Sequence, residues 1–288
     1  ERERLAGAVR TLTVEAMVQD KKAIQAGTSH YLGQNFAKAA GIQFLGRDNT
    51  KQFAHTTSWG VSTRLIGTMI MAHGDDDGVM LPPRIAPQQI VILPVTPKPD
   101  TRQEIIDACE ALAQTLRAQT WAGEPIRVLV DKRDLPGGQK NWEWIKKGVP
   151  MRVEMGPRDI TSRSVAVARR DKSPKEKEFI PKEDFLQTVQ ERLADIQQAL
   201  LDRATAMRDA NMKKLDTLDE FKAFFADENG GGFALMHWAG TMEEEEKLAK
   251  ENKITIRCIP NGDQYAEEGK CFLTGRPSSR RVVFARSY

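Results

Sequence analysis

The chain has 288 residues, of which 40% are hydrophobic and 29% are charged, and its formal net charge is +3 at pH 7. These values are typical of a globular protein with two or three domains, and so small a charge does not by itself indicate a nucleic-acid partner. No apolar run is long enough to span a membrane, and the N-terminus lacks a signal-peptide pattern. The three cysteines form no CxxC pair, which favours a reducing compartment, so we expect a cytoplasmic protein.

The first 86 residues favour an antiparallel sheet with helices packed on it, because strand-like stretches outnumber helices and lie close together. Apolar residues alternate from 11 to 18, which is typical of a half-buried strand. Since this alternation comes so early in a chain that begins without methionine, we expect a fragment of a longer protein. Further strands are predicted at 23–29 and 52–58, and helices after Gly33 and at 62–73.

A different pattern follows Leu81-Pro82-Pro83, which we interpret as a linker because two prolines interrupt regular structure. Beyond it, strands alternate with helices over about 100 residues, which predicts a βαβ arrangement with a mostly parallel or mixed sheet. The predicted strands are 90–95, 127–131, 151–155 and 165–168, and the predicted helices are 101–119 and 139–147.

A charged stretch at 169–178 leads into a long predicted helix at 182–213. The remaining residues mix helices and strands, which predicts a small α+β unit. Its helices are expected at 218–226 and 242–251, and its strands at 233–238, 254–259 and 281–285.

Two segments of the first region are more specific than these patterns. One reads QAGTSH from Gln25 to His30, and the other reads TTSWGVSTRLIG from Thr56 to Gly67. They closely resemble the proline-pocket segment and motif 3 of class II prolyl-tRNA synthetases, in the form shared by archaea, the eukaryotic cytosol and some bacteria. The resemblance continues at 147–150, 156–159 and 285–288, and so covers essentially the whole chain.

The resemblance implies an α/β and α+β multidomain protein. Residues 1–86 would be the C-terminal part of the catalytic domain, with a partial class II antiparallel sheet and helices. Residues 87–181 would form an α/β anticodon-binding domain with a mixed sheet, and residues 182–214 a connecting helix. Residues 215–288 would form a small α+β C-terminal domain of the zinc-binding type. Motifs 1 and 2 of the family are not in the chain, so we assign no catalytic residue within it.

Arg64 stands in the first turn of a predicted helix, where the helix dipole also favours an anion. The resemblance identifies it as the motif 3 arginine that contacts ATP, and its charge would offset the charge that accumulates on the phosphates. The resemblance also places Gln25 and Thr28 at the ATP site.

Thr28 and His30 are two residues apart on an extended segment, so their side chains share one face. Gln25 is out of phase with them, and joins that face only through a local bend at Ala26-Gly27. The resemblance makes Thr28 and His30 part of a proline site. It adds a wall formed by Ser58, Trp59 and Gly60.

Three further positions are open to more than one interpretation. Trp59 is as well explained by packing as by contact with proline. Glu15 lies on the first predicted strand and is a weaker candidate for the same interior. The terminal Tyr288 is a family feature, and the resemblance implies that it brings the chain end back toward the active site.

The resemblance also implies an anticodon site in the second region, at Arg152, Arg158 and Asp159. A carboxylate suits the N1 and N2 donors of guanine, and an arginine suits its O6 and N7 acceptors. Recognition of unpaired bases also uses aromatic stacking, for which Trp142 and Trp144 are nearby. The chain departs from the family pattern at two positions, since Asn141 and Ile145 stand where an aromatic residue and a glutamate are usual.

The third region resembles a domain that in many relatives holds zinc through four cysteines. Here only Cys271 remains at the expected places, and one thiolate does not make a tetrahedral site. We therefore predict no structural zinc and no other metal site. Apolar packing is expected instead, from Phe233, Leu235, Ile254, Ile256, Phe272, Val283 and Phe284.

The family activity would be that of a proline–tRNA ligase, an aminoacyl-tRNA synthetase that uses ATP with Mg²⁺ and joins proline to tRNA(Pro). The full-length enzyme would be a homodimer, whereas the fragment alone is expected to be inactive. One alternative is a non-catalytic, synthetase-derived tRNA-binding protein. Another is a sister class II synthetase for threonine, histidine or glycine, against which the GTSH pocket segment argues.

Overall fold

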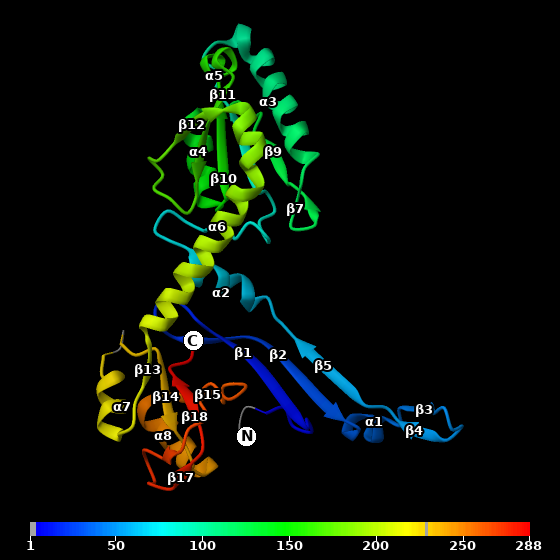
Figure 1. The fold of residues 1–288 in the computed structure, drawn as a ribbon, viewed down its shortest axis with the longest axis vertical. Coiled ribbons are helices and arrows are strands. Elements are labelled where there is room, and N and C mark those ends of the chain that lie inside the picture. The colour runs from blue at the N-terminus through cyan, green and yellow to red at the C-terminus, as the bar shows by residue number, and fades with distance from the viewer. Residues whose placement is uncertain (1–3, 228–229) are drawn as a thin grey trace. The chain divides into compact units, whose positions relative to one another are not determined.

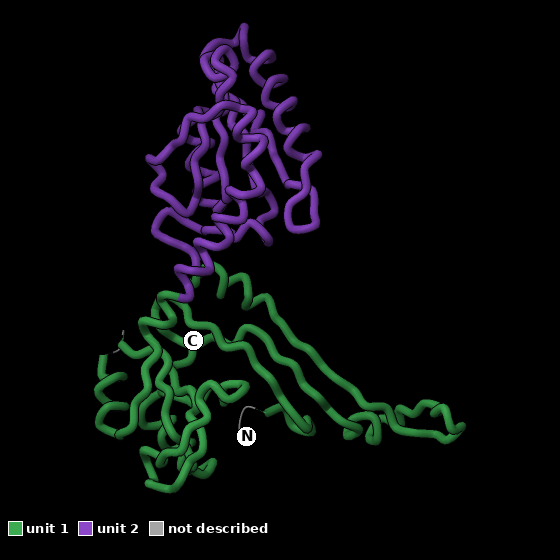
Figure 2. Tube along the Cα trace, viewed as in Figure 1, with its two compact units in different colours: residues 1–72, 206–288 green, residues 73–205 purple. Residues whose placement is uncertain are grey.

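The computed structural model describes residues 4–227 and 230–288. The chain divides into two units, the first formed by residues up to 72 together with 206–288, and the second by residues 73–205 (Figure 2). Within the described residues, no helix combines the length and the apolar character needed to cross a membrane.

Unit 1 begins with an antiparallel sheet in the order β1-β2-β5 (Figure 1). Its strands are β1 (Arg10–Met17), β2 (Ala23–Gly33) and β5 (Thr56–Gly60). The predicted strand at 52–58 is in fact two, because β4 (Lys51–Phe53) pairs with β3 (Gln43–Leu45) in a separate hairpin. The helices are α1 (Asn35–Ala40) and α2 (Arg64–His73), which confirms the predicted sheet with helices.

A second sheet in unit 1 has the order β13-β14-β18-β15. Its strands are β13 (Met212–Lys214), β14 (Phe233–His237), β18 (Arg281–Ala285) and β15 (Thr255–Cys258). Helices α7 (Leu218–Phe224) and α8 (Met242–Asn252) accompany it, together with a hairpin of β16 (Gly269–Lys270) and β17 (Pro277–Ser278). The mixture of helices and strands predicted for this region is thus confirmed.

Both helices of this part begin with a capping box, which satisfies backbone N–H groups that a helix start leaves free. Thr217 accepts from the amide of Glu220, whose carboxylate accepts from the Thr217 amide in return. Thr241 and Glu244 repeat the arrangement at α8. These local bonds explain why the starts of α7 and α8 were predictable from the sequence.

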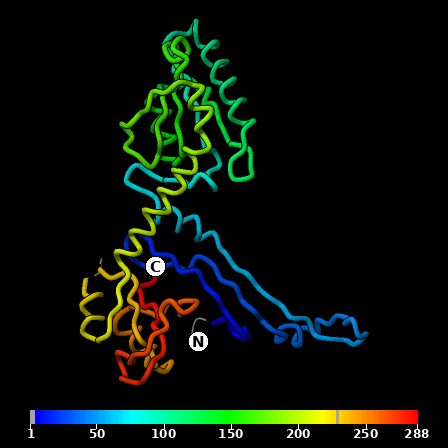
Figure 3. Tube along the Cα trace, in the orientation of Figure 1, coloured from blue at the N-terminus to red at the C-terminus, as the bar shows by residue number. Residues whose placement is uncertain are grey.

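The two sheets of unit 1 meet where the end of the chain returns to its beginning, as the blue and red segments in Figure 3 show. Ser287 forms a parallel bridge with Ala23, and the Tyr288 amide donates to the Ala23 carbonyl at 3.0 Å. A buried cluster combines side chains of both sheets, namely Met17, Ala23, Phe233, Leu235, Val283 and Ala285. The C-terminal sheet therefore packs against β1 and β2.

Unit 2 contains a five-stranded mixed sheet in the order β12-β11-β10-β6-β9, in which β6, β9 and β10 are parallel. Its strands are β6 (Ile90–Pro94), β9 (Val128–Val130), β10 (Met151–Met155), β11 (Ser164–Arg169) and β12 (Glu178–Pro181). The mixed sheet is as predicted, although β12, which begins where the charged stretch ends, was not recognised.

Helices cover both faces of this sheet (Figure 1). The core on one face involves α3 (Arg102–Arg117), which follows a 3-10 turn η1 (Pro99–Thr101), and α6 (Lys182–Ala210). The other face packs against α4 (Gly137–Lys146) through Val91, Leu93, Trp144 and Val149. The remaining elements are α5 (Pro157–Ser162) and a hairpin of β7 (Thr120–Trp121) and β8 (Glu124–Pro125).

Two segments differ from the sequence predictions. The long helix ends at Ala210 and not at 213, because Met212–Lys214 pairs in parallel with β14. The proline pair at 82 and 83 is buried, and the Pro83 carbonyl accepts from Gln89 at 3.1 Å and from Arg127 at 3.0 Å. The segment interpreted as a linker is thus packed within unit 2.

Asp131 follows β9 and bonds to the loop before α4 and to the last turn of that helix. It is 3% exposed and accepts bonds from Arg133, at 2.9 and 2.7 Å, and from Trp144 Nε1 at 2.8 Å. Burial disfavours its charged form, but the bonds from Arg133 and Trp144 outweigh this and hold the pKa of Asp131 at about 2.

Replacing Asp131 by asparagine is expected to lower the free energy of unfolding by about 2 kcal/mol at pH 7. Because the folded-state pKa is depressed, the contribution of Asp131 is complete above its ordinary pKa of 3.8 and is lost as the pH falls toward about 2. Urea unfolding followed by tryptophan fluorescence should therefore show the difference narrowing below pH 4. The exposed Asp134→Asn is the control and should show no such pH-dependent difference.

Candidate functional site

One face of the β1-β2-β5 sheet gathers the polar residues predicted to line a pocket. Thr28 pairs with Gly60, and His30 pairs with Ser58. Paired residues on neighbouring strands project to the same face, so these four positions lie together. The structure thus brings together most of the residues predicted for the proline site.

Gln25 joins this face through a β-bulge in β2. Val14 pairs with Gly27, whereas the next residue, Glu15, pairs with Gln25, so Ala26 has no partner in the ladder. Because of this extra residue, the side chain of Gln25 projects to the same face of the sheet as that of Thr28. The bend predicted at Ala26-Gly27 is confirmed.

His30 is held in place by the neighbouring strand. Thr11 Oγ1 lies 2.9 Å from His30 Nδ1, and the two residues face each other in the β1-β2 pairing. Because this contact engages one ring nitrogen, it fixes the plane of the imidazole and leaves Nε2 for another partner. Thr11 was not singled out from the sequence, although its spacing of two and four from Thr13 and Glu15 on an alternating strand is the signal that places it on this face.

The residues of β5 have different roles. A Cβ atom on Gly60 would lie 3.2 Å from Thr28 Oγ1, so glycine permits the close approach of the two strands here. Trp59 pairs with Ser29, which places it on the opposite face, and it is 80% exposed. The structure therefore does not bring Trp59 together with the other predicted proline-site residues.

Arg64 begins α2 and lines a hollow of about 560 Å³ beside the chain end. The other residues around the hollow are Ile24, Thr63, Gly67, Met71 and Tyr288. Ile24 alternates with Gln25 on β2, so this hollow borders the face opposite to the polar one. Lys22 Nζ lies 5.4 Å from the centre of the Tyr288 ring, which helps to hold the chain end there.

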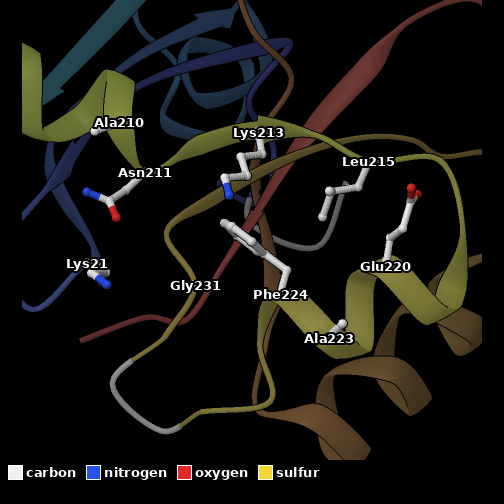
Figure 4. Close-up of a pocket in the computed structure, with 9 residues that line it drawn as sticks. All are labelled: Lys21, Ala210, Asn211, Lys213, Leu215, Glu220, Ala223, Phe224 and Gly231. Carbon is white, nitrogen blue, oxygen red and sulfur yellow. The ribbon is translucent and has the colours of Figure 1, made fainter.

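Another hollow in unit 1, of about 450 Å³, is shown in Figure 4. Its lysines are Lys21 and Lys213, and Lys213 Nζ lies 5.9 Å from the centre of the Phe224 ring. The Glu220 carboxylate accepts from the amides of Asp216 and Thr217, which form the start of α7. The hollow therefore carries two lysines, and its acidic residue, Glu220, is engaged by the backbone before α7.

In unit 2, the Arg152 side chain is buried under α4. Its Nε donates to Asn141 Oδ1 at 2.7 Å, while Nη1 and Nη2 are buried without a hydrogen-bond partner among the described residues. Burial, reinforced by the charge of Arg170, lowers the pKa of Arg152 to about 10. A buried guanidinium with two free donors is costly unless a ligand with two acceptors occupies it.

Arg158 and Asp159 lie on α5, in different surroundings. Arg158 is exposed and borders a hollow of about 370 Å³ with Pro157, Thr161 and Ser162. Asp159 Oδ2 accepts from the Gly156 amide at 2.9 Å, so one of its oxygens already caps the helix. Their proposed role at the anticodon, like that of Arg152, stays a prediction.

The two tryptophans of α4 differ in exposure. Trp144 is buried and bonded to Asp131, so it serves the fold. Trp142 is 42% exposed, and Lys146 Nζ lies 5.7 Å from the centre of its ring. Of the two, Trp142 is the one that a base can reach.

The part of unit 1 that resembles a zinc domain is held by apolar packing. The ring centre of Trp238 lies 6.0 Å from that of Phe272 and 5.7 Å from that of Phe284. All seven apolar residues named from the sequence lie in or against two buried clusters. Among residues 4–227 and 230–288, no group of three or more His, Cys, Asp and Glu side chains is arranged to hold a metal.

The purified protein is expected to contain less than about 0.1 zinc per chain, because among the described residues no three ligand side chains lie together to build a tetrahedral site. Metal content measured by plasma mass spectrometry tests this directly. Removing metal with EDTA should also leave the melting temperature unchanged. Stoichiometric zinc, or a loss of stability on chelation, would contradict the prediction.

Comparison with known proteins supports the resemblance found in the sequence. A family model described as "Anticodon binding domain" matches residues 89–192, and one described as "Prolyl-tRNA synthetase, C-terminal" matches residues 218–288. A proline–tRNA ligase of Akkermansia muciniphila is 57% identical over 100% of this chain and 57% of its own length. Proline–tRNA ligase 2 of Anaeromyxobacter dehalogenans is 52% identical over 100% of this chain and 58% of its own.

A third relative, a proline–tRNA ligase of Protochlamydia amoebophila, is 50% identical over 99% of this chain. It is covered over 57% of its length, so the chain spans less than two thirds of the relatives that it matches. The anticodon-binding match precedes the C-terminal match along the chain. The chain therefore belongs to the class II prolyl-tRNA synthetase family and corresponds to its C-terminal region, which includes the anticodon-binding domain.

Proposed function

We propose that the protein to which this chain belongs is a proline–tRNA ligase. In the first step, the proline carboxylate attacks the α-phosphate of ATP, which forms prolyl-adenylate and releases pyrophosphate. In the second, a hydroxyl of the 3′-terminal adenosine of tRNA(Pro) attacks the activated carbonyl and releases AMP. Magnesium enters bound to the phosphates of ATP, and the protein acts as a cytoplasmic homodimer.

The observation that carries this proposal is the convergence of Gln25, Thr28 and His30 on one face of the sheet. Side chains with hydroxyl, amide and imidazole groups suit a small zwitterion such as proline and the ribose end of ATP. Gly60 leaves room on this face for the Thr28 hydroxyl, which would lie 3.2 Å from a Cβ atom at position 60. The face therefore offers polar contacts to a small amino acid.

Arg64 would contribute at the other end of ATP. It lies in the first turn of α2, four residues after the end of β5, so its side chain and the helix N-terminus would meet the phosphates by reaching round the end of that strand. Such preorganised charge stabilises the transition state of adenylate formation more than it stabilises the bound substrates.

Arg152, Arg158 and Asp159 would recognise the anticodon of tRNA(Pro). The two free donors of Arg152 match the paired O6 and N7 acceptors of guanine. Because these donors are covered, binding requires movement of the side chains over them. Trp142 is the available stacking partner.

The test is proline-dependent exchange between ATP and pyrophosphate, measured with the full-length protein and a panel of amino acids. Exchange with proline alone is expected. Exchange with threonine, histidine or glycine in place of proline would assign a sister synthetase. Binding of tRNA(Pro) without any exchange would identify a non-catalytic, synthetase-derived RNA-binding protein.

A further inference from the structure

A buried ion pair joins the C-terminal sheet to the first strand of the chain. Arg257 in β15 places Nε and Nη2 each 3.0 Å from Glu15 Oε2 in β1. The two side chains are 9% and 3% exposed, and the residues are 242 positions apart in the chain. An ion pair so well shielded from solvent is much less weakened by salt than a surface pair, and its geometry is correspondingly well defined.

Thr13 also contacts Glu15, and it lies on the same face of the sheet as Thr28 and His30. Thr13 Oγ1 lies 3.0 Å from Glu15 Oε1 and 3.4 Å from the Gly27 carbonyl oxygen. A hydroxyl has a single hydrogen, so Thr13 donates mainly to one of these acceptors. Because Arg257 occupies Oε2 only, Oε1 remains to take that hydrogen.

The position of this contact matters, because the sheet is irregular here. The ladder between β1 and β2 shifts between Val14 and Glu15, where Ala26 is left out of the pairing. A bulge loses regular backbone bonds, so neighbouring side chains have more influence on its conformation. Gly27 follows the bulge directly and precedes Thr28, which lines the predicted pocket.

Arg257 also has a hydrogen-bond partner within its own strand. Its Nη1 donates to Thr255 Oγ1 at 3.4 Å within the same strand. The pairing of β15 with β18 holds the strand on both sides of Arg257, at Ile256 and Cys258, while Arg257 itself occupies an irregularity in the ladder. Through its contact with Glu15, Arg257 therefore links the C-terminal sheet to the strand that pairs with the bulge in β2.

We propose that Arg257 is a positioning residue for the amino-acid site: it fixes Glu15, whose Oε1 draws the Thr13 hydroxyl away from the Gly27 carbonyl, and it thereby sets the conformation of the Gly27–His30 segment. The proposal rests on the proposed function, because the amino acid bound there is proline. It gives the C-terminal sheet a part in amino-acid binding, and Arg257 itself does not contact the substrate.

The first test compares Arg257→Ala with Arg280→Ala in the full-length protein. Arg280 belongs to the same region and is exposed, so it controls for the loss of one positive charge. Arg257→Ala is expected to raise the KM for proline ~10-fold in the exchange reaction and to leave the KM for ATP within about twofold, because misplaced contacts weaken proline binding. Arg257→Lys keeps the charge and should restore part of the loss.

A second variant separates positioning from stability. Replacing a buried ion pair by apolar residues is often neutral for folding, so the double variant Glu15→Leu/Arg257→Met is expected to fold. It removes the acceptor of Thr13, so its KM for proline should stay raised even though its melting temperature is near that of the parent. If Arg257→Ala does not fold, the KM for proline of this double variant tests the proposal.

The outcomes are distinct. A double variant with the parent KM for proline would show that the pair only stabilises the fold, and this would overturn the proposal. An equal rise in the KM values for proline and ATP would do the same. If the parent protein shows no proline-dependent exchange, the proposed function fails first, whatever the behaviour of Arg257.

Discussion

Replacing Arg64 by alanine is expected to lower the rate of proline-dependent exchange by ~10²–10³-fold, while the melting temperature stays within about 2 °C. Arg64 is exposed at the start of α2, so its loss leaves no cavity and no buried partner. Its charge and the helix N-terminus would act together on the phosphates of ATP, whose charge is redistributed in the transition state. The measurement is initial-rate exchange at saturating proline and ATP.

Two variants sharpen this test. Arg64→Lys keeps the charge but loses the planar guanidinium, so it should recover only a small part of the rate. Arg47→Ala removes an exposed arginine from a loop of the same unit and should leave the rate unchanged. A fall of less than about threefold in Arg64→Ala would refute its assignment as the ATP contact, because loss of such a contact costs far more.

Elements with a strong local pattern were predictable from the sequence. The strands Met151–Met155 and Arg281–Ala285 were predicted with the bounds that the structure has, because the first alternates apolar and charged residues and the second is a short apolar run after Arg281. The capping sequences explain the correct starts of α7 and α8. In these places the local preference and the tertiary packing agree.

The elements that were missed depend on partners distant in the chain. Glu178–Pro181 is a short edge strand that follows a charged stretch and ends in proline, and it exists because it pairs with β11. Met212–Lys214 continues a helical pattern, but its pairing with β14 overrides that pattern. Pairing with a remote strand leaves no local trace in a single sequence.

The candidate site shows the same division. The spacing of Thr28 and His30 predicted a shared face, and a bulge for Gln25 followed from its phase. Arg257 had no such signal, because its contact with Glu15 spans 242 positions. Burial of Arg152 was also unexpected, since arginine is seldom fully buried.

Replacing Arg152 by methionine is expected to stabilise the fold and to impair the use of tRNA. The guanidinium is buried with two donors that lack a partner among the described residues, and this costs free energy that an apolar side chain of similar length avoids. We expect the free energy of unfolding to rise by about 1–3 kcal/mol. The kcat/KM for tRNA(Pro) in aminoacylation should fall ~10–100-fold, as expected for loss of a bidentate contact to guanine.

The two readouts together distinguish recognition from structure. The exchange reaction needs no tRNA, so its rate should be unchanged in Arg152→Met, and Arg84→Met provides an exposed arginine control in the same unit. A fall in stability with unchanged aminoacylation would show that Arg152 supports the fold and does not read the anticodon. The expected pattern, a more stable protein that discriminates tRNA less well, arises because a site must keep polar groups available for its ligand at the expense of its own stability.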